Sequence, residues 1–178
     1  MTQPPEEENK YQKKIGTNMV ILAWIVFLGL LTLLFGDFLD KQFNPNQGVS
    51  SRKSSGNVEI VLDQNQEGHY VAGAFINNIP VDVMLDTGAS SVSIPERLAA
   101  EMKLQYGLEM MVSTANGNIP VYATRLDEVR LGDIVLRNVR ADINPYMDDD
   151  FVLLGMSFLK QLEFTQRGKK LILRQLQN

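Results

Sequence analysis

The residues best suited to chemistry lie where an apolar stretch ends in an acid. The run reads Val83-Met84-Leu85-Asp86-Thr87-Gly88-Ala89-Ser90. Its apolar residues predict a strand that places Asp86 near the centre of a domain. Gly88 permits a tight turn in which backbone amides approach the carboxylate. A carboxyl group held in this way can accept or donate a proton, and so can act as a general base or acid.

Other residue types offer little alternative chemistry. His69 is the sole histidine, and we expect it to be a surface or packing residue, so a Ser-His-Asp triad is not expected. The chain has no cysteine and therefore no disulfide, thiolate metal site or cysteine nucleophile. The run Asp148-Asp149-Asp150 could attract a cation, but a solvated acidic loop is the favoured interpretation. We expect no metal or other cofactor.

Length and charge narrow the choice of function. At 178 residues the chain has room for one soluble domain with a hydrophobic core. The formal net charge is -4, and the sequence contains no long run of Lys or Arg. Because nucleic acid binding needs a basic surface for the phosphates, we do not expect a nucleic acid partner.

The N-terminal part predicts a membrane helix. Residues 15–36 contain no charged side chain, and about 20 apolar residues suffice to cross a bilayer. A cleaved signal peptide is less favoured because no small-x-small cleavage site follows the apolar segment. A buried core helix is less favoured because every face of the predicted helix is apolar. Lys13 and Lys14 predict that the tail, residues 1–14, is cytoplasmic. Residues 37–57 have the polar composition of a flexible linker, and the soluble domain would occupy residues 58–178.

The pattern after residue 57 is typical of an all-β domain. Short β-type runs alternate with turn signals, as in a sandwich or barrel. Asn77-Asn78 and Asn116-Gly117 are expected hairpin turns, because Asn and Gly tolerate positive φ. Short helices are predicted from Pro95 to Met102 and from Met156 to Gln161. The predicted strands are 58–62, 69–76, 80–85, 91–94, 109–114, 119–124, 126–131, 134–142 and 151–154.

Two further segments join Asp86-Thr87-Gly88 in a recognisable order. The hairpin sequence from Met110 to Val121 follows it, and the run Phe151-Val152-Leu153-Leu154-Gly155 comes after that. Together they resemble retroviral-type (retropepsin-like) aspartic proteases, most closely the bacterial single-domain versions anchored in a membrane. The resemblance covers residues 58 to 174. It implies a closed barrel or sandwich with one short C-terminal helix, preceded here by the transmembrane helix.

The resemblance also implies roles for individual residues. Asp86 would be the catalytic residue, supported in its loop by Thr87, Gly88 and Ala89. The hydrophobic run would brace that loop through Leu153, Leu154 and Gly155. The substrate-covering flap would include Thr114, Ala115, Asn116, Gly117 and Asn118. Because Ala89 lacks the hydroxyl that pepsin-like enzymes have at this place, we expect an activity optimum less acidic than that of a pepsin.

One Asp-Thr-Gly per chain predicts a homodimer that cleaves peptides or proteins. No other aspartate is followed by Thr-Gly or Ser-Gly, so two copies would share one site. Ser90 and Met156 replace an acid and an arginine that pair near the dimer interface of many retroviral proteases, which suggests a different dimer contact. Two alternatives stay open: a catalytically silent dimer that binds peptides or partner proteins, and a membrane-tethered adaptor. The expected location is a bacterial inner membrane, with the protease domain in the periplasm.

Overall fold

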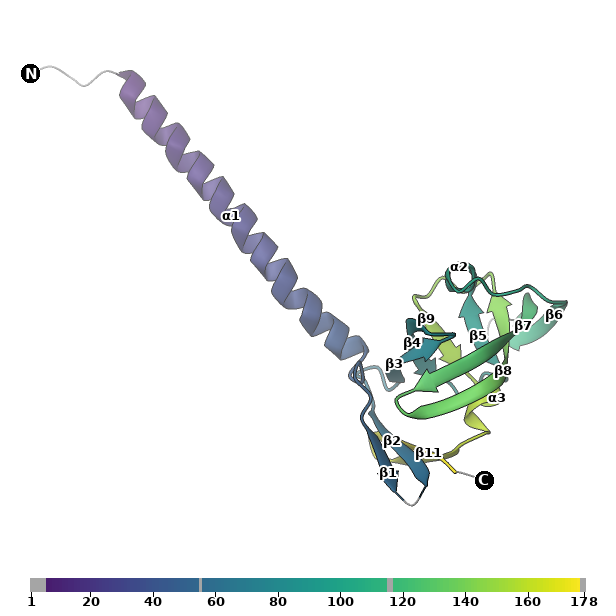
Figure 1. Cartoon of the computed structure of the whole chain (residues 1–178). Helices are drawn as coiled ribbons and strands as arrows, with labels where there is room; N and C mark the ends of the chain where they lie inside the picture. Colours follow the sequence, from purple (N-terminus) through teal and green to yellow (C-terminus); the bar gives the residue numbers. More distant parts are fainter. Residues whose placement is uncertain (1–5, 55, 115–116, 177–178) are drawn as a thin grey trace, which may run out of the picture. The chain divides into compact units, whose positions relative to one another are not determined.

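The computed structural model describes residues 6–54, 56–114 and 117–176 (Figure 1). It divides into two compact units, Met1–Asp40 and Lys41–Asn178. The first unit consists of most of helix α1 (Glu6–Phe43), and the second contains all of the strands.

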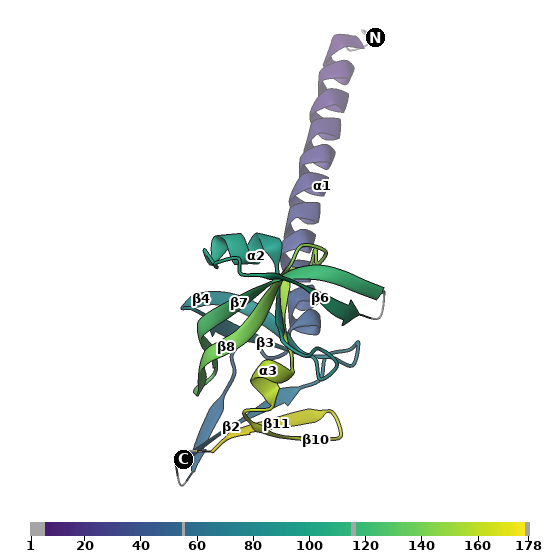
Figure 2. The same cartoon turned by 90° about the vertical axis from the view of Figure 1, so that its right-hand side faces the viewer.

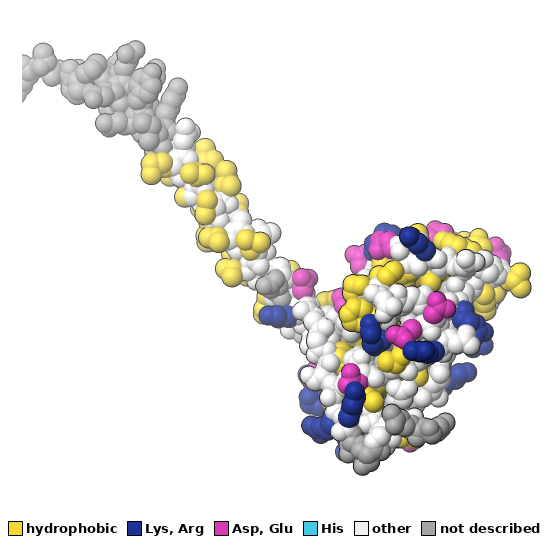
Figure 3. All heavy atoms as spheres, in the orientation of Figure 1, with side chains coloured by type: hydrophobic (Ala, Val, Ile, Leu, Met, Phe, Trp, Pro, Cys, Tyr) yellow, Lys and Arg dark blue, Asp and Glu magenta, His cyan; other side chains and the backbone are white. Residues whose placement is uncertain are grey.

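Helix α1 is apolar over much of its length. In the part of the chain that the structure describes, Asn18–Phe43 is the one helical segment long and apolar enough to cross a membrane. Its large side chains, such as Trp24 and Leu33, are exposed, and Figure 3 shows hydrophobic side chains along the visible face. By length and composition the segment fits either a membrane span or a signal sequence. The helix continues to Phe43, so the first residues of the predicted linker are helical.

The domain is mostly β, as predicted, and its larger sheet has seven strands. Their spatial order is β3-β4-β9-β5-β8-β7-β6, and an additional pairing of β3 with β7 closes the sheet on itself. This closure confirms the predicted barrel-like, retropepsin-like architecture. The strands are β3 (Tyr70–Ile76), β4 (Ile79–Leu85), β5 (Val92–Pro95), β6 (Glu109–Thr114), β7 (Gly117–Leu131), β8 (Ile134–Asn144) and β9 (Phe151–Leu154).

A smaller antiparallel sheet has the order β1-β2-β11-β10 (Figures 1 and 2). Of its strands, only β2 was predicted, and β1, β10 and β11 were missed. Gly168 at φ 59° turns the chain between β10 and β11, whose ends pair at Arg167 and Lys170. The strands are β1 (Ser51–Ser54), β2 (Asn57–Asp63), β10 (Glu163–Arg167) and β11 (Lys170–Gln175).

Alternating side chains from both sheets build one core. Ile60 and Leu62 of β2, Ile143 of β8 and Leu154 of β9 are fully buried and belong to the same hydrophobic cluster. Period-two alternation explains this arrangement, because every second residue of a strand faces the same side. The predicted turn at Asn77-Asn78 is present, with φ 49° and 66°.

Two short helices in the domain lie close to their predicted positions. Helix α2 (Glu96–Glu101) begins directly after Pro95, and α3 (Met156–Leu159) begins directly after Gly155. Both are shorter than expected. Helix α3 contributes Phe158 and Leu159 to the core, so its position relative to β9 is fixed by packing.

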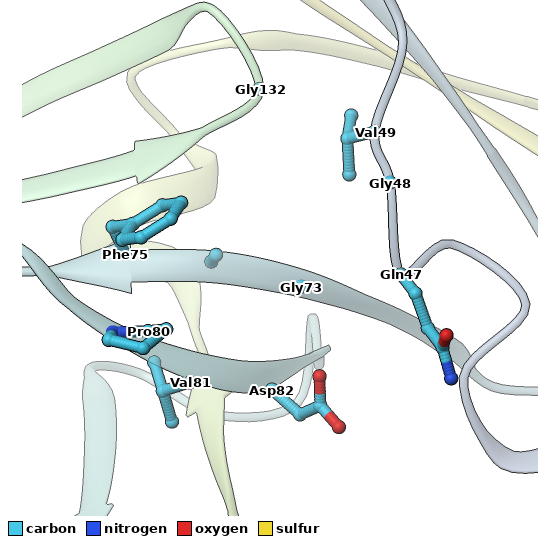
Figure 4. A pocket seen from close by; sticks show the side chains of 10 residues that line it. Gln47, Gly48, Val49, Gly73, Phe75, Pro80, Val81, Asp82 and Gly132 are labelled. Atoms are coloured by element: carbon cyan, nitrogen blue, oxygen red, sulfur yellow. The ribbon is translucent and has the colours of Figure 1, made fainter. Parts of the chain in front are cut away.

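Residues 44–51, which we call the strap, correct the prediction of a flexible linker. Asn44 and Asn46 are buried, and Asn46 forms a parallel bridge with Ala72 of β3. The strap passes so close to Gly73 that a Cβ atom there would lie 2.8 Å from the Gln47 carbonyl oxygen. Figure 4 shows the strap beside β3 at Gly73. Polar composition was misleading here, because the asparagine side chains bond within the domain. Asn46 bonds to the backbone of Asp63 and Val71, and Asn44 donates to the Asp82 carboxylate.

Candidate active site

Asp86 lies directly after β4, in a loop that leads to β5. Strand β9 runs between these two strands, parallel to β4 and antiparallel to β5. Leu85 pairs with Leu154, and Ser93 pairs with Leu153. The segment predicted to brace the loop therefore lies between its two ends.

Backbone hydrogen bonds hold the loop in place. The Asp86 N–H donates to the Leu154 carbonyl at 3.1 Å, and the Met156 N–H donates to the Ala89 carbonyl at 2.8 Å. Within the loop, the Gly88 N–H donates to Oδ1 of Asp86 at 2.8 Å. Asp86 is half-buried, while Thr87 and Gly88 are exposed. The carboxylate is thus oriented by a backbone amide and still open to the surface.

Gly155 occupies a position where no side chain fits. A Cβ atom there would collide with the Ser91 carbonyl oxygen and lie 2.6 Å from the Ala89 carbonyl oxygen. Any larger residue would push the loop away from β9. The glycine after the hydrophobic run is therefore required by the close approach of two backbone segments, which gives that sequence feature a physical cause.

A row of side chains extends across the sheet beside Asp86. Met84 pairs with Leu153, Leu153 with Ser93, and Ser93 with Asp142 of β8. Residues paired across strands share a face, and this row begins at Met84, beside the end of β4 that leads into Asp86. The opposite face carries fully buried core residues such as Val83 and Leu154. We call this row, with Asp86 and Ser91, the floor of the candidate site.

Sequence reasoning missed one polar cluster in the floor. The hydroxyls of Ser91 and Ser93 both donate to the carboxylate of Asp142, the latter at 2.7 Å. Asp142 is only 4% exposed. Strand alternation could have predicted that Asp142 lies on the other face of its strand from Ala141 and Ile143. The sequence does not reveal which strand lies beside Asp142.

The predicted flap corresponds to the hairpin of β6 and β7, which lies at one end of the domain in Figures 1 and 2. Thr114 pairs with Gly117, and its hydroxyl donates to the Gly117 carbonyl at 2.8 Å. Asn118 pairs with Ser113. Ala115 and Asn116, which were predicted to belong to the flap, lie outside the described residues. Met111 in β6 is 61% exposed, so the hairpin carries apolar surface that could cover a substrate.

Other features lie apart from Asp86. A cavity of about 520 Å³ opens between the strap and strands β3 and β4, and none of the loop residues 86–91 lines it (Figure 4). His69 is exposed, in agreement with the expectation of a surface residue. Among the described residues, no group of three or more acidic or histidine side chains is arranged to hold a metal ion.

The chain is similar to known proteins in both sequence and structure. Residues 72–161 match the family model of the gag-polyprotein putative aspartyl protease. The chain is similar to a retropepsin-like aspartic protease from Rickettsia conorii of known crystal structure, with 30% identity and a TM-score of 0.57. That match covers 72% of this chain and 96% of the Rickettsia chain.

Two curated relatives have no assigned activity. One is an uncharacterised Sinorhizobium protein encoded in the cobV 5′ region, 32% identical over 74% of this chain. The other is an uncharacterised protein of Rickettsia prowazekii (strain Madrid E), 28% identical over 65% of this chain. The chain spans 58% and 50% of their respective lengths. The family match, the fold and the loop at Asp86 lead to one conclusion: the chain belongs to the retropepsin-like aspartic protease family.

Proposed function

We propose that the chain is an aspartic endopeptidase that works as a homodimer, with one Asp86 from each copy. The observation that supports this most strongly is the single Asp86-Thr87-Gly88 loop, fixed by β9 with its carboxylate still open to the surface. One carboxyl group cannot serve at the same time as base and acid. A second copy related by a two-fold axis supplies the missing group.

The chemistry needs both carboxyl groups. Two carboxyls held about 3 Å apart share one proton, a rule established on aspartic proteases themselves. The ionised Asp86 takes a proton from water, whose oxygen attacks the peptide carbonyl carbon, while the protonated Asp86 gives its proton to the carbonyl oxygen. The tetrahedral intermediate then collapses: the Asp86 that took the proton from water gives it to the nitrogen as the C–N bond breaks, and the other Asp86 takes back the proton of the hydroxyl group. In this proposal Thr87 links the two loops, and Gly88 presents backbone groups to the substrate.

The dimer contact in this proposal differs from that of many retroviral proteases. Ser90 is exposed and Met156 is half-buried, and these two residues cannot form an ion pair. A weaker contact is compatible with function if both copies are held in one membrane, because tethering raises their effective concentration.

The apolar segment of α1 supports a membrane anchor in this proposal. We place the N-terminal tail in the cytoplasm and the protease domain in the periplasm of a bacterial inner membrane, on the basis of Lys13 and Lys14 before the segment. A retained anchor predicts that the full chain stays with the membrane pellet after alkaline extraction. Release into the supernatant would instead favour a cleaved signal sequence.

The test uses the full chain in lipid nanodiscs, with Asp86→Asn as the matched variant. Peptides from a denatured protein digest are incubated with each from acidic to neutral pH, and the new ends are read by mass spectrometry. We expect cleavage by the wild type alone. Cleavage by both proteins would indicate a contaminating protease. Absence of cleavage from a dimeric wild type would favour the silent peptide-binding module or the adaptor.

A further inference from the structure

The floor beside Asp86 contains a buried acid without a cationic partner. Asp142 accepts hydrogen bonds from Ser91 and Ser93. No ion pair joins Asp142 to a Lys, Arg or His side chain in the part of the chain that the structure describes. A buried carboxylate is costly unless its oxygens are hydrogen-bonded, so these two hydroxyls are held in fixed orientations.

The orientation of the hydroxyls determines what they offer to a ligand. A serine hydroxyl has one hydrogen to donate and two lone pairs to accept. In Ser91 and Ser93 that hydrogen is directed at Asp142. Both serines are only half-buried. A ligand that approaches from the solvent side therefore meets the lone pairs of the two hydroxyl oxygens. The surface over Asp142 therefore presents acceptors, with an acid directly beneath them.

We propose that Asp142, Ser91 and Ser93 form a specificity pocket that selects a hydrogen-bond donor, best a lysine or arginine side chain, in the bound peptide. Ser91 and Ser93 contact that side chain, and Asp142 is a positioning residue that acts through them. This inference rests on the proposed function, since it concerns the peptide that the same site would hold. It goes further by assigning a chemical class to one substrate position for each copy of the chain.

The geometry limits the preference to one substrate position for each copy of the chain, which makes two positions in the peptide bound by a two-fold dimer. Ser93 lies beside Leu153, which lies beside Met84 and the strand end that carries Asp86. A peptide bound as an extended strand directs alternate side chains to the floor. A site built to hydrogen-bond one side chain discriminates strongly against an apolar analogue of the same length, because its acceptors are then left unpaired.

The test measures binding separately from cleavage. The full chain with Asp86→Asn, in nanodiscs, is titrated into fluorescein-labelled peptides that carry a single lysine or a single norleucine at each position in turn. Fluorescence anisotropy gives the affinity ratio of each pair. We expect lysine to bind about tenfold more tightly at the two positions that face the two copies of the pocket, and equally elsewhere.

Three additional variants identify the cause. Asp142→Asn can donate to a serine and turn its hydroxyl outward, so the lysine preference should fall to about one. Ser93→Ala, which leaves the acid in place, should reduce the ratio severalfold and serves as the second variant if Asp142→Asn does not fold. The exposed Asp127→Asn changes the net charge equally and should leave the ratio unchanged.

The outcomes separate this inference from the proposed function. A ratio near one at every position, or an unchanged ratio in both Asp142→Asn and Ser93→Ala, overturns the specificity pocket. Peptide cleavage by the wild-type chain is scored independently, so a silent binding module could still show the lysine preference. A cleaving enzyme without that preference would keep the proposed function and lose the pocket.

Discussion

Replacing Asn46 by alanine should destabilise the domain without touching the candidate active site. The side-chain nitrogen Nδ2 of Asn46 donates to the carbonyls of Val71 and Asp63 at 2.7 and 2.9 Å. Its Oδ1 accepts from the Asp63 N–H at 2.8 Å. Alanine would leave these three backbone groups without their partner in a position that is only 7% exposed.

The magnitude follows from these three bonds. Each buried polar group left unpaired costs about 1–3 kcal/mol, and such costs are not additive when water can enter. We expect the free energy of unfolding to fall by about 2–4 kcal/mol, and the melting temperature by about 10 °C. Gln47→Ala is the matched control, since this neighbour is exposed and should change the free energy of unfolding by less than about 0.5 kcal/mol.

The assay is thermal unfolding of the full chain in detergent micelles, followed by near-ultraviolet circular dichroism of the tyrosines. The single tryptophan lies in α1 and does not report on the domain. If Asn46→Ala and Gln47→Ala unfold at the same temperature as wild type, the strap is a loose tether and the reasoning is refuted.

Two further predictions concern the loop at Asp86. Gly155→Ala should abolish most peptide cleavage, because the new Cβ would collide with the Ser91 carbonyl. Its control is Gly48→Ala, where no atom lies within 4 Å, and equal activity of the two variants would contradict the argument. Ala89→Ser should shift the optimum of the pH–activity profile to lower pH, because an added hydroxyl donor favours the charged carboxylate. Greater activity than wild type at neutral pH would contradict it.

The sequence predicted all seven strands of the larger sheet but only β2 of the smaller one. Strand β9 and strand β6 have the predicted bounds, since apolar runs and turn residues delimit them. Strand β10 was missed because Phe164 is its one apolar residue, so its sequence has no apolar run. Such a strand forms because it pairs with β11, and this tertiary contact cannot be predicted from the local propensity of its residues.

The candidate site was predictable only in its local part. The Asp86 loop and the run before Gly155 are contiguous in sequence, so a motif could identify them. The cluster at Asp142 depends on the register between β5 and β8, which places Ser93 beside Asp142. The strap was wrongly predicted to be flexible because its asparagines were expected to face solvent. In the structure Asn46 is buried, and its side chain forms hydrogen bonds with backbone groups of neighbouring strands.

A mixing experiment tests the central claim most directly, that two copies of Asp86 make one active site. A fixed amount of wild-type chain is combined with increasing Asp86→Asn chain, allowed to exchange subunits in detergent, and assayed for cleavage of a single peptide. Random pairing predicts that an equal amount of the variant lowers the activity to about half, and a threefold excess to about a quarter. Activity that stays constant as Asp86→Asn is added would contradict the shared site.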